Sequence, residues 1–212
     1  MKFFKFVIIG FIVLNYIALG CATAPSQFSE YPSQPLSRFD RELFARALLH
    51  QQKGQIEPAI VLWNKFLQKN PNSFAARNNL GLLYYANDDV TQAVYNFDRG
   101  FKLRPEAVQL KIHLVRALKI RASILEENRE YDEAIMDLRR VAKLSPAKEQ
   151  EGVERQVEAL EDRIFEQVKK SNSMEEYQGF LKKYPNSPGN SDEARLWIEN
   201  RLQVDKMNNQ KP

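Results

Sequence analysis

The sequence predicts an all-α protein made of helical repeats, and three observations support this prediction. The segment 54–71 aligns with the segment 88–105 at a constant offset of 34 residues. Proline recurs at one position of the repeat, at Pro71, Pro105, Pro146 and Pro185. Apolar residues recur at the spacing of one helix face, as at Ala93, Phe97 and Phe101. A fixed period of this length indicates helix pairs that stack on one another.

Residues 1–20 have the layout of a secretory signal peptide. Lys2 and Lys5 precede an apolar run from Phe6 to Leu19, and the small residue Gly20 precedes Cys21. The run has 14 residues, whereas a helix that crosses a membrane needs about 20. We therefore expect a cleaved leader and not a permanent transmembrane anchor.

The segment Ala18-Leu19-Gly20-Cys21 resembles the bacterial lipobox. In that family the cysteine thiol receives diacylglycerol, the leader is cut before the cysteine and the new amino group is acylated. The resemblance implies that Cys21 is the lipidation site of a bacterial envelope lipoprotein. Ala22 follows in place of the aspartate of inner-membrane retention signals, which implies an outer-membrane protein facing the periplasm. Ordinary signal-peptidase cleavage near residues 22–24 is the alternative, and it would discard Cys21.

Residues 21–36 are predicted to form a flexible, lipid-anchored tether, because prolines lie there among Ser, Gln and Thr. The chain is nearly balanced in charge, since Lys and Arg outnumber Asp and Glu by only 31 to 27. Acidic and basic residues are interleaved, as in the segment 126–130. This pattern indicates a solvated helix surface, and we expect no nucleic-acid partner.

Residues 37–146 are predicted to hold three repeats. The third copy begins 41 residues after the second, which is one repeat plus seven residues. Seven residues are two helical turns, so we expect them to lengthen the helix over 108–128 without changing its inward face. Gly81 lacks a side chain where two helices are expected to cross closely.

Residues 147–206 are predicted to form a degenerate fourth repeat and a capping helix. A charged helix over 149–170 carries an apolar stripe, which either packs on the chain itself or associates with another copy as a coiled coil. Ser173 and Glu176 have the spacing of a capping box. The capping helix is expected over 192–206, with Leu202 on its inward side, and a disordered tail over 207–212.

These blocks resemble the tetratricopeptide repeat, a helix-turn-helix motif of 34 residues. That family has a small residue at position 20, an aromatic residue at position 24 and proline at position 32. Position 20 corresponds here to Ala59, Ala93, Ala134 and Ser173, and position 24 to Trp63, Phe97, Leu138 and Tyr177. The resemblance implies a right-handed superhelical solenoid of about four repeats with a C-terminal capping helix, which acts as a protein-binding scaffold.

In this family, positions 2, 5, 9 and 12 of each first helix line a concave groove. The resemblance therefore implies candidate partner-binding residues, which are Phe44, Asn78, Leu82, Tyr85, Arg116 and Lys119, and it also places Ser123 and Glu126 on that face. Apolar and polar side chains mixed in this way would suit an extended peptide, because apolar anchors supply contact area and polar groups supply orientation.

Motifs for catalysis are not found in the sequence. There is no phosphate-binding glycine loop, nucleophile elbow or zinc-protease motif, and His50 and His113 lack triad-like neighbours. Asp88 and Asp89 lie at an expected helix start, where carboxylates interact favourably with the helix dipole. We therefore expect no enzyme activity, no cofactor and no metal.

The expected function is that of a membrane-anchored scaffold for protein–protein interactions in envelope assembly, such as secretion, pilus, outer-membrane or cell-wall machinery. The alternative is a structural spacer subunit that associates with itself through the helix over 149–170.

Overall fold

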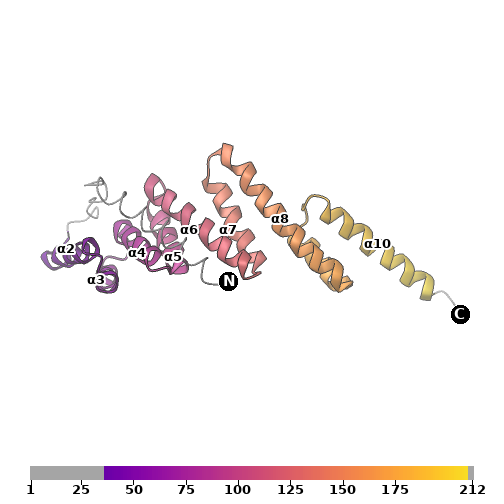
Figure 1. Ribbon diagram of the computed structural model, residues 1–212, viewed down its shortest axis with the longest axis horizontal. Helices are drawn as coiled ribbons and strands as arrows, with labels where there is room; N and C mark the ends of the chain where they lie inside the picture. The colour runs from indigo at the N-terminus through magenta and orange to yellow at the C-terminus, as the bar shows by residue number, and fades with distance from the viewer. Residues whose placement is uncertain (1–35, 210–212) are drawn as a thin grey trace, which may run out of the picture. The chain divides into compact units, whose positions relative to one another are not determined.

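The computed structural model describes residues 36–209, and every regular element in that range is an α-helix (Figure 1). The predicted all-α class is confirmed. The helices, each separated from the next by a short turn, are α2 (Arg38–Gln52), α3 (Ile56–Lys69), α4 (Phe74–Ala86), α5 (Val90–Leu103), α6 (Val108–Glu127), α7 (Tyr131–Leu144), α8 (Ala147–Ser171), α9 (Met174–Lys183) and α10 (Asn190–Asn209).

The repeat is visible in the turns that join paired helices. Each of the first three pairs is closed by a backbone hydrogen bond of the same kind, and the residue before the donor has a left-handed conformation. The amides of Gln55, Asp89 and Glu130 donate to the carbonyls of His50, Tyr84 and Leu125 at 3.0, 2.9 and 2.8 Å. The left-handed residues are Gly54, Asp88 and Arg129, with φ of 68°, 58° and 66°. These positions repeat with the offsets found in the sequence.

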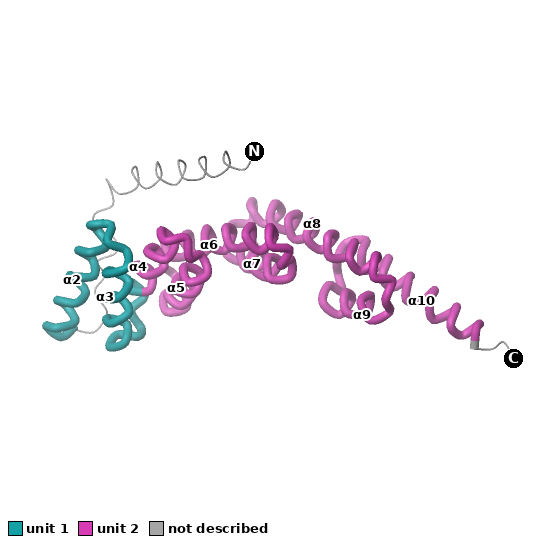
Figure 2. Tube along the Cα trace, turned by 60° about the horizontal axis from the view of Figure 1, so that its bottom comes forward, with its two compact units in different colours: residues 1–76 teal, residues 77–212 magenta. Residues whose placement is uncertain are grey.

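The chain divides into two compact units, and the boundary lies between Ala76 and Arg77, inside α4 (Figure 2). The boundary thus falls within the block 37–146 that the sequence predicted as three consecutive repeats. In the first unit, α2 packs on α3 around three aromatic residues. Phe44 meets Trp63 edge to face with ring centroids 4.8 Å apart, and both contact Phe66. Trp63 is fully buried, and its indole N–H donates to Oε1 of Gln51 at 3.1 Å.

In the second unit, consecutive helices pack on one another from α5 to α10. The largest fully buried apolar side chains of this unit form its core, and they are Leu80, Phe97, Leu110, Leu114, Leu118, Ile135, Val141 and Phe165. α6 has 20 residues, which confirms that the seven extra residues lengthen this helix. Asp137 on α7, although buried, accepts two hydrogen bonds from the guanidinium of Arg121 on α6, at 2.7 and 2.6 Å.

Aromatic contacts hold the last three helices together. Phe165 on α8 contacts Tyr177 and Phe180 on α9, with ring centroids 5.9 and 4.8 Å apart. Tyr177 in turn stacks on Trp197 of α10 at 4.0 Å, with the two rings nearly parallel. α10 therefore covers the exposed side of α9, as the predicted capping helix should.

Three local predictions for this region are wrong. Ser173 is the N-cap of α9, but its side chain makes no capping hydrogen bond. Leu202 was expected to point inward and is instead exposed, because α10 extends beyond the helix on which it packs. α10 continues to Asn209, so residues 207–209, expected in a disordered tail, are helical.

Candidate partner-binding groove

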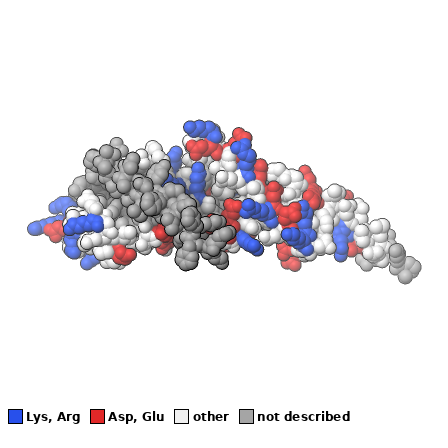
Figure 3. Space-filling model, in the orientation of Figure 1, with Lys and Arg blue, Asp and Glu red and all other residues white. Residues whose placement is uncertain are grey.

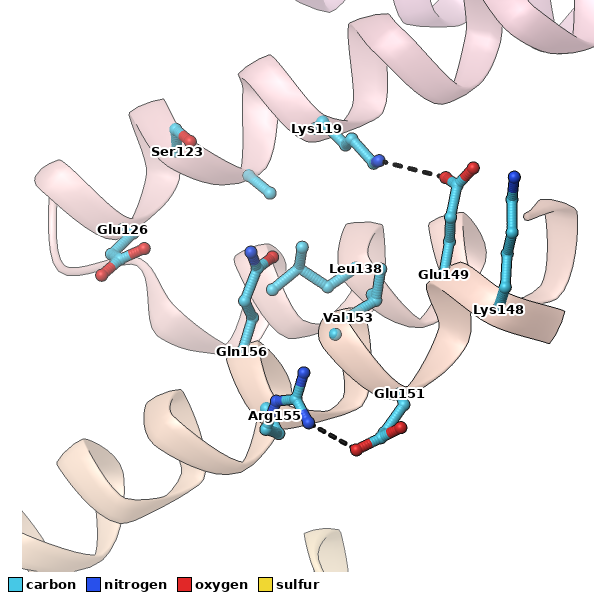
Figure 4. Close-up of a pocket in the computed structure, with 12 residues that line it drawn as sticks. Lys119, Ser123, Glu126, Leu138, Lys148, Glu149, Glu151, Val153, Arg155 and Gln156 are labelled. Atoms are coloured by element: carbon cyan, nitrogen blue, oxygen red, sulfur yellow. Dashed lines mark hydrogen bonds and ion pairs between the residues drawn. The ribbon is translucent and has the colours of Figure 1, made fainter. Parts of the chain in front are cut away.

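A cavity of about 510 Å³ opens on the second unit where α6, α7 and α8 meet (Figure 4). We call it the α6–α8 cavity. The helix α6 contributes Lys119, Ser123 and Glu126 to one wall, and the buried residues Ala122, Leu138 and Val153 supply apolar surface. The facing wall is the first part of α8, with Lys148, Glu149, Glu151, Gly152, Arg155 and Gln156.

Helical periodicity explains why the wall residues of α6 face the same way. Lys119, Ser123 and Glu126 are four and three residues apart, so they lie on one side of the helix. α6 and α8 are the first helices of the third and fourth repeats. The cavity therefore lies between successive first helices, the helices on which the resemblance to the tetratricopeptide repeat implies the groove.

Gly152 leaves α8 without a side chain at the wall of the cavity. A Cβ built at Gly152 would meet only the end of the Arg155 side chain, at 4.0 Å. Packing within the chain thus does not require glycine here. Glycine inside a helix costs about 1 kcal/mol relative to alanine, so the residue weakens α8 while it keeps the cavity open.

Charged side chains at the rim form solvent-exposed pairs. Nζ of Lys119 lies 3.8 Å from a carboxylate oxygen of Glu149, and both side chains are about half exposed. Arg155 pairs with Glu151 at 2.5 Å, and Glu126 pairs with Arg163 at 2.7 Å. Exposed pairs of this kind are typically worth about 0.2–1 kcal/mol. A ligand with charged groups would therefore exchange partners with them at little cost.

On the face drawn in Figure 3, acidic and basic side chains are interspersed over the uncovered part of the second unit. The lining of the cavity is likewise mixed in charge, because it carries three basic residues and three acidic ones. The lining therefore favours a ligand that carries both charges or polar groups over one of a single strong charge.

The structure places the predicted groove residues in three kinds of environment. Lys119 lies in the α6–α8 cavity, and Arg116 is exposed one turn before it on α6. Leu82 and Tyr85 are partly exposed on α4. Phe44 and Asn78 are buried, with 5% and 1% of their surface exposed, so their assignment to a partner-binding surface is wrong. Cys21 lies outside the described residues.

Phe44 and Asn78 are buried because other residues cover them. Phe44 is part of the aromatic cluster with Trp63 and Phe66. Asn78 on α4 meets His113 on α6, and Nδ1 of His113 lies 2.9 Å from Oδ1 of Asn78. Since an amide oxygen only accepts, the neutral ring carries its proton on Nδ1 and donates it.

His113 is held in its neutral form by this environment. Burial, and secondarily the positive charge of Arg116, lowers the pKa of His113 from 6.5 to about 4. The ring also lies against Phe97, with centroids 5.4 Å apart. His113 is thus neutral at neutral pH and packs, partly exposed, against Asn78 and Phe97.

Sequence reasoning missed the α8 wall of the cavity. Gly152, Arg155 and Gln156 were assigned to a charged helix with no role in the groove, and Lys148 lay before the expected start of that helix. The one available signal was Gly152, because a glycine in the interior of a charged helix lowers helix stability and calls for a packing or functional reason.

Within residues 36–209, no group of three or more His, Cys, Asp or Glu side chains is arranged to hold a metal ion. In the same range, no helix is long and apolar enough to cross a membrane.

Comparison with known proteins supports the repeat type. Residues 43–73 and 115–148 each match a model of the tetratricopeptide repeat. No curated protein sequence matches the chain. These two segments are therefore similar to the tetratricopeptide repeat, a motif that in general serves as a scaffold for protein interactions and is typically not catalytic.

Solved structures of low sequence identity match the chain over most of its length. A crystal structure of the MamA protein is 18% identical, covers 81% of this chain and 94% of its own, and has a TM-score of 0.42. The double mutant MamA RS-1 ArsTM is 14% identical, covers 84% of this chain and all of its own, with a TM-score of 0.42. The human IFIT1 dimer with m7Gppp-AAAA is 18% identical and has a TM-score of 0.37; the match covers 78% of this chain and 47% of IFIT1.

Proposed function

We propose that this protein is a lipid-anchored scaffold that holds a segment of a protein partner in the α6–α8 cavity. The observation that carries the proposal is the cavity itself, which lies between the first helices of successive repeats and has an apolar floor beneath exchangeable ion pairs. An apolar side chain of the partner that enters the cavity over Leu138 and Val153 would bury its own apolar surface. Groups beside it would replace the pairing of Lys119 with Glu149 and fix the orientation of the segment.

The cellular setting is part of the proposal. The lipobox-like segment that ends at Cys21 supports attachment to the bacterial envelope, and Ala22 supports the outer membrane facing the periplasm. A tether of about 15 residues has a root-mean-square reach of roughly 20 Å. The scaffold would therefore present its partner close to the membrane, within an assembly of the envelope.

Self-association through α8 is the weaker alternative. The apolar stripe proposed for that contact includes Val153, Val157 and Leu160, and all three are buried within the chain. Residues that pack in the chain's own core do not also form a seam with a second copy.

The experiment closes the cavity without disturbing the fold. In Gly152→Leu, a leucine side chain should occupy the cavity while helix propensity increases. Gly179→Leu is the matched control, because Gly179 is exposed on α9 and a Cβ there meets no atom within 4 Å. Both variants are made in a protein that carries a photo-crosslinking residue at Ser123, inside the cavity.

We expect cross-linked partner from membranes with the parent protein and with Gly179→Leu. With Gly152→Leu we expect the yield to fall about tenfold or more, since tenfold corresponds to only about 1.4 kcal/mol of lost affinity. Equal yields from the two leucine variants, with both folded by circular dichroism, would contradict the proposed site.

A further inference from the structure

A second cavity, of about 400 Å³, opens where α8 faces the turn that follows α9. We call it the α8–α9 cavity. One wall is formed by the α8 residues Glu154, Val157, Glu158 and Glu161, and the other wall by residues 184–188. It shares no lining residue with the α6–α8 cavity. The two cavities are therefore separate sites of the second unit.

The carboxylate of Glu161 is buried in this wall with one oxygen unpaired. Its side chain is only 5% exposed. Oε1 accepts a hydrogen bond from Nη2 of Arg139 on α7 at 2.7 Å, and no described residue donates to Oε2. Buried carboxylates normally have partners for both oxygens, because removing the charge from water is costly. Since Glu161 lines the cavity, a donor that enters the cavity supplies the missing hydrogen bond.

The other charges of the lining leave the α8–α9 cavity negative. Glu154 and Glu158 are exposed, and neither forms an ion pair within residues 36–209. The two basic residues of the lining are already paired. Arg139 bonds the buried carboxylate, and Nζ of Lys183 lies 2.5 Å from a carboxylate oxygen of Asp132. Two carboxylates therefore remain uncompensated, and the cavity favours a cation over an anion.

The spacing of these carboxylates suits an extended peptide. Glu154, Glu158 and Glu161 are four and three residues apart, so they share one face of α8. The first two are about 6 Å apart along the helix axis. In an extended chain, side chains two residues apart point the same way and are about 6.6 Å apart. Val157 lies on the same face and is buried, so it offers apolar surface to the methylene stem of a lysine.

We propose that the α8–α9 cavity binds an extended, basic segment of a protein partner. Two lysine or arginine side chains of the segment, two residues apart, pair with Glu154 and Glu158, and the one on Glu158 also donates to Oε2 of Glu161. This site uses no residue of the α6–α8 cavity, so a test of either site leaves the other unchanged.

The test removes the two uncompensated charges. The double variant Glu154→Gln with Glu158→Gln keeps the size of both side chains, and it should fold like the parent chain because neither residue has an ion-pair partner in the described part of the chain. The matched control is Glu127→Gln with Glu199→Gln. It removes two exposed carboxylates that line neither cavity, so both double variants have the same net charge.

The probe is the fluorescently labelled, end-capped peptide Ala-Lys-Ala-Lys-Ala, and fluorescence anisotropy measures its binding to the full chain in a mild detergent at low salt. We expect equal affinity for the parent chain and the control. For Glu154→Gln with Glu158→Gln we expect affinity about tenfold lower, which corresponds to about 1.4 kcal/mol.

A second peptide, Ala-Lys-Lys-Ala-Ala, separates this site from general attraction between charges. It has the same charge, but its two lysines point to opposite sides of an extended chain. We expect it to bind the parent chain about threefold or more weakly than the first peptide, because one of the two ion pairs is lost.

Three results would overturn the proposal. Equal affinity of the first peptide for the two double variants, including no binding to either, would place any basic segment elsewhere. Equal binding of the two lysine peptides to the parent chain would reduce the effect to net charge. Tighter binding of Ala-Glu-Ala-Glu-Ala than of the first peptide would assign the cavity to an acidic segment.

Discussion

Gly81 on α4 faces the ring of Phe97 on α5 at a distance that admits no side chain. A Cβ at Gly81 would lie 2.4 Å from Cε1 of Phe97, which is itself 1% exposed. Such a contact forces either the ring or the helix to move, because the core is closely packed.

We predict that Gly81→Leu lowers the free energy of unfolding, since overpacking typically costs about 1–3 kcal/mol. Urea denaturation followed by circular dichroism measures the change, with Gly179→Leu as a glycine replacement in open space. Equal urea midpoints for Gly81→Leu and the parent chain would show that α4 and α5 do not cross closely at this residue.

His113 makes stability depend on pH, because it is neutral in the folded state. The unfolded chain takes up a proton at this residue below about pH 6.5, whereas the pKa in the folded state is about 4. The contribution of His113 is therefore complete above pH 6.5 and is lost as the pH falls toward 4. The loss amounts to about 3 kcal/mol at most.

We predict that His113→Gln flattens this dependence, because glutamine retains an N–H donor for Asn78 but does not titrate. Urea midpoints at pH 7.5, 5.5 and 4.5 are compared for the two proteins. The difference between the two proteins at each pH gives the contribution of His113 alone, because the carboxylates titrate equally in both. Parallel pH profiles would mean that the pKa of His113 does not change on folding.

At the level of the elements, the turn between paired helices imposes one backbone conformation on three different residues. Gly54, Asp88 and Arg129 all have positive φ, and for any residue except glycine this conformation costs roughly 1 kcal/mol or more. Asp89 follows in the second repeat, and its carboxylate caps α5 by accepting from the amide of Gln92 at 3.0 Å. This is the structural role expected for acids at a helix start.

We predict that Arg129→Gly raises the free energy of unfolding by about 1 kcal/mol, because glycine adopts a positive φ without a steric cost. Arg99→Gly is the control, since Arg99 is exposed inside α5, and there the same replacement should lower stability by about 1 kcal/mol. Thermal melts of both variants provide the test. A loss of stability in Arg129→Gly would contradict a strained turn.

Attachment to the membrane is a prediction about the whole molecule. If Cys21 carries acyl chains, each buried CH₂ contributes about 0.8 kcal/mol, and two or more chains give stable anchoring. We therefore predict that Cys21→Ser moves the protein from the membrane fraction to the soluble fraction, while Thr23→Ser does not. Mass spectrometry of the parent amino terminus should show the added fatty acids. An unmodified terminus, together with unchanged fractionation of Cys21→Ser, would exclude lipidation.

Most helices could be predicted from the sequence because their signals are local. The apolar period of 3.6 residues depends only on neighbouring residues, and the recurring prolines and the offset of 34 residues can be found by comparing the chain with itself. Together they located the repeats and the two extra turns of α6. The grouping of Lys119, Ser123 and Glu126 was implied by the resemblance to the tetratricopeptide repeat, and residues at these spacings share a face of a helix.

Only the tertiary structure decided which of these faces stay open. Phe44 and Asn78 occupy groove positions in the repeat, yet aromatic neighbours cover the first, and the second meets His113, 35 residues along the chain. The cavity at Gly152 exists because α8 stands opposite α6, and the second half of α10 is exposed because α9 is shorter. Burial depends on what lies across from a residue, and the repeat pattern records only the residue's place on its own helix.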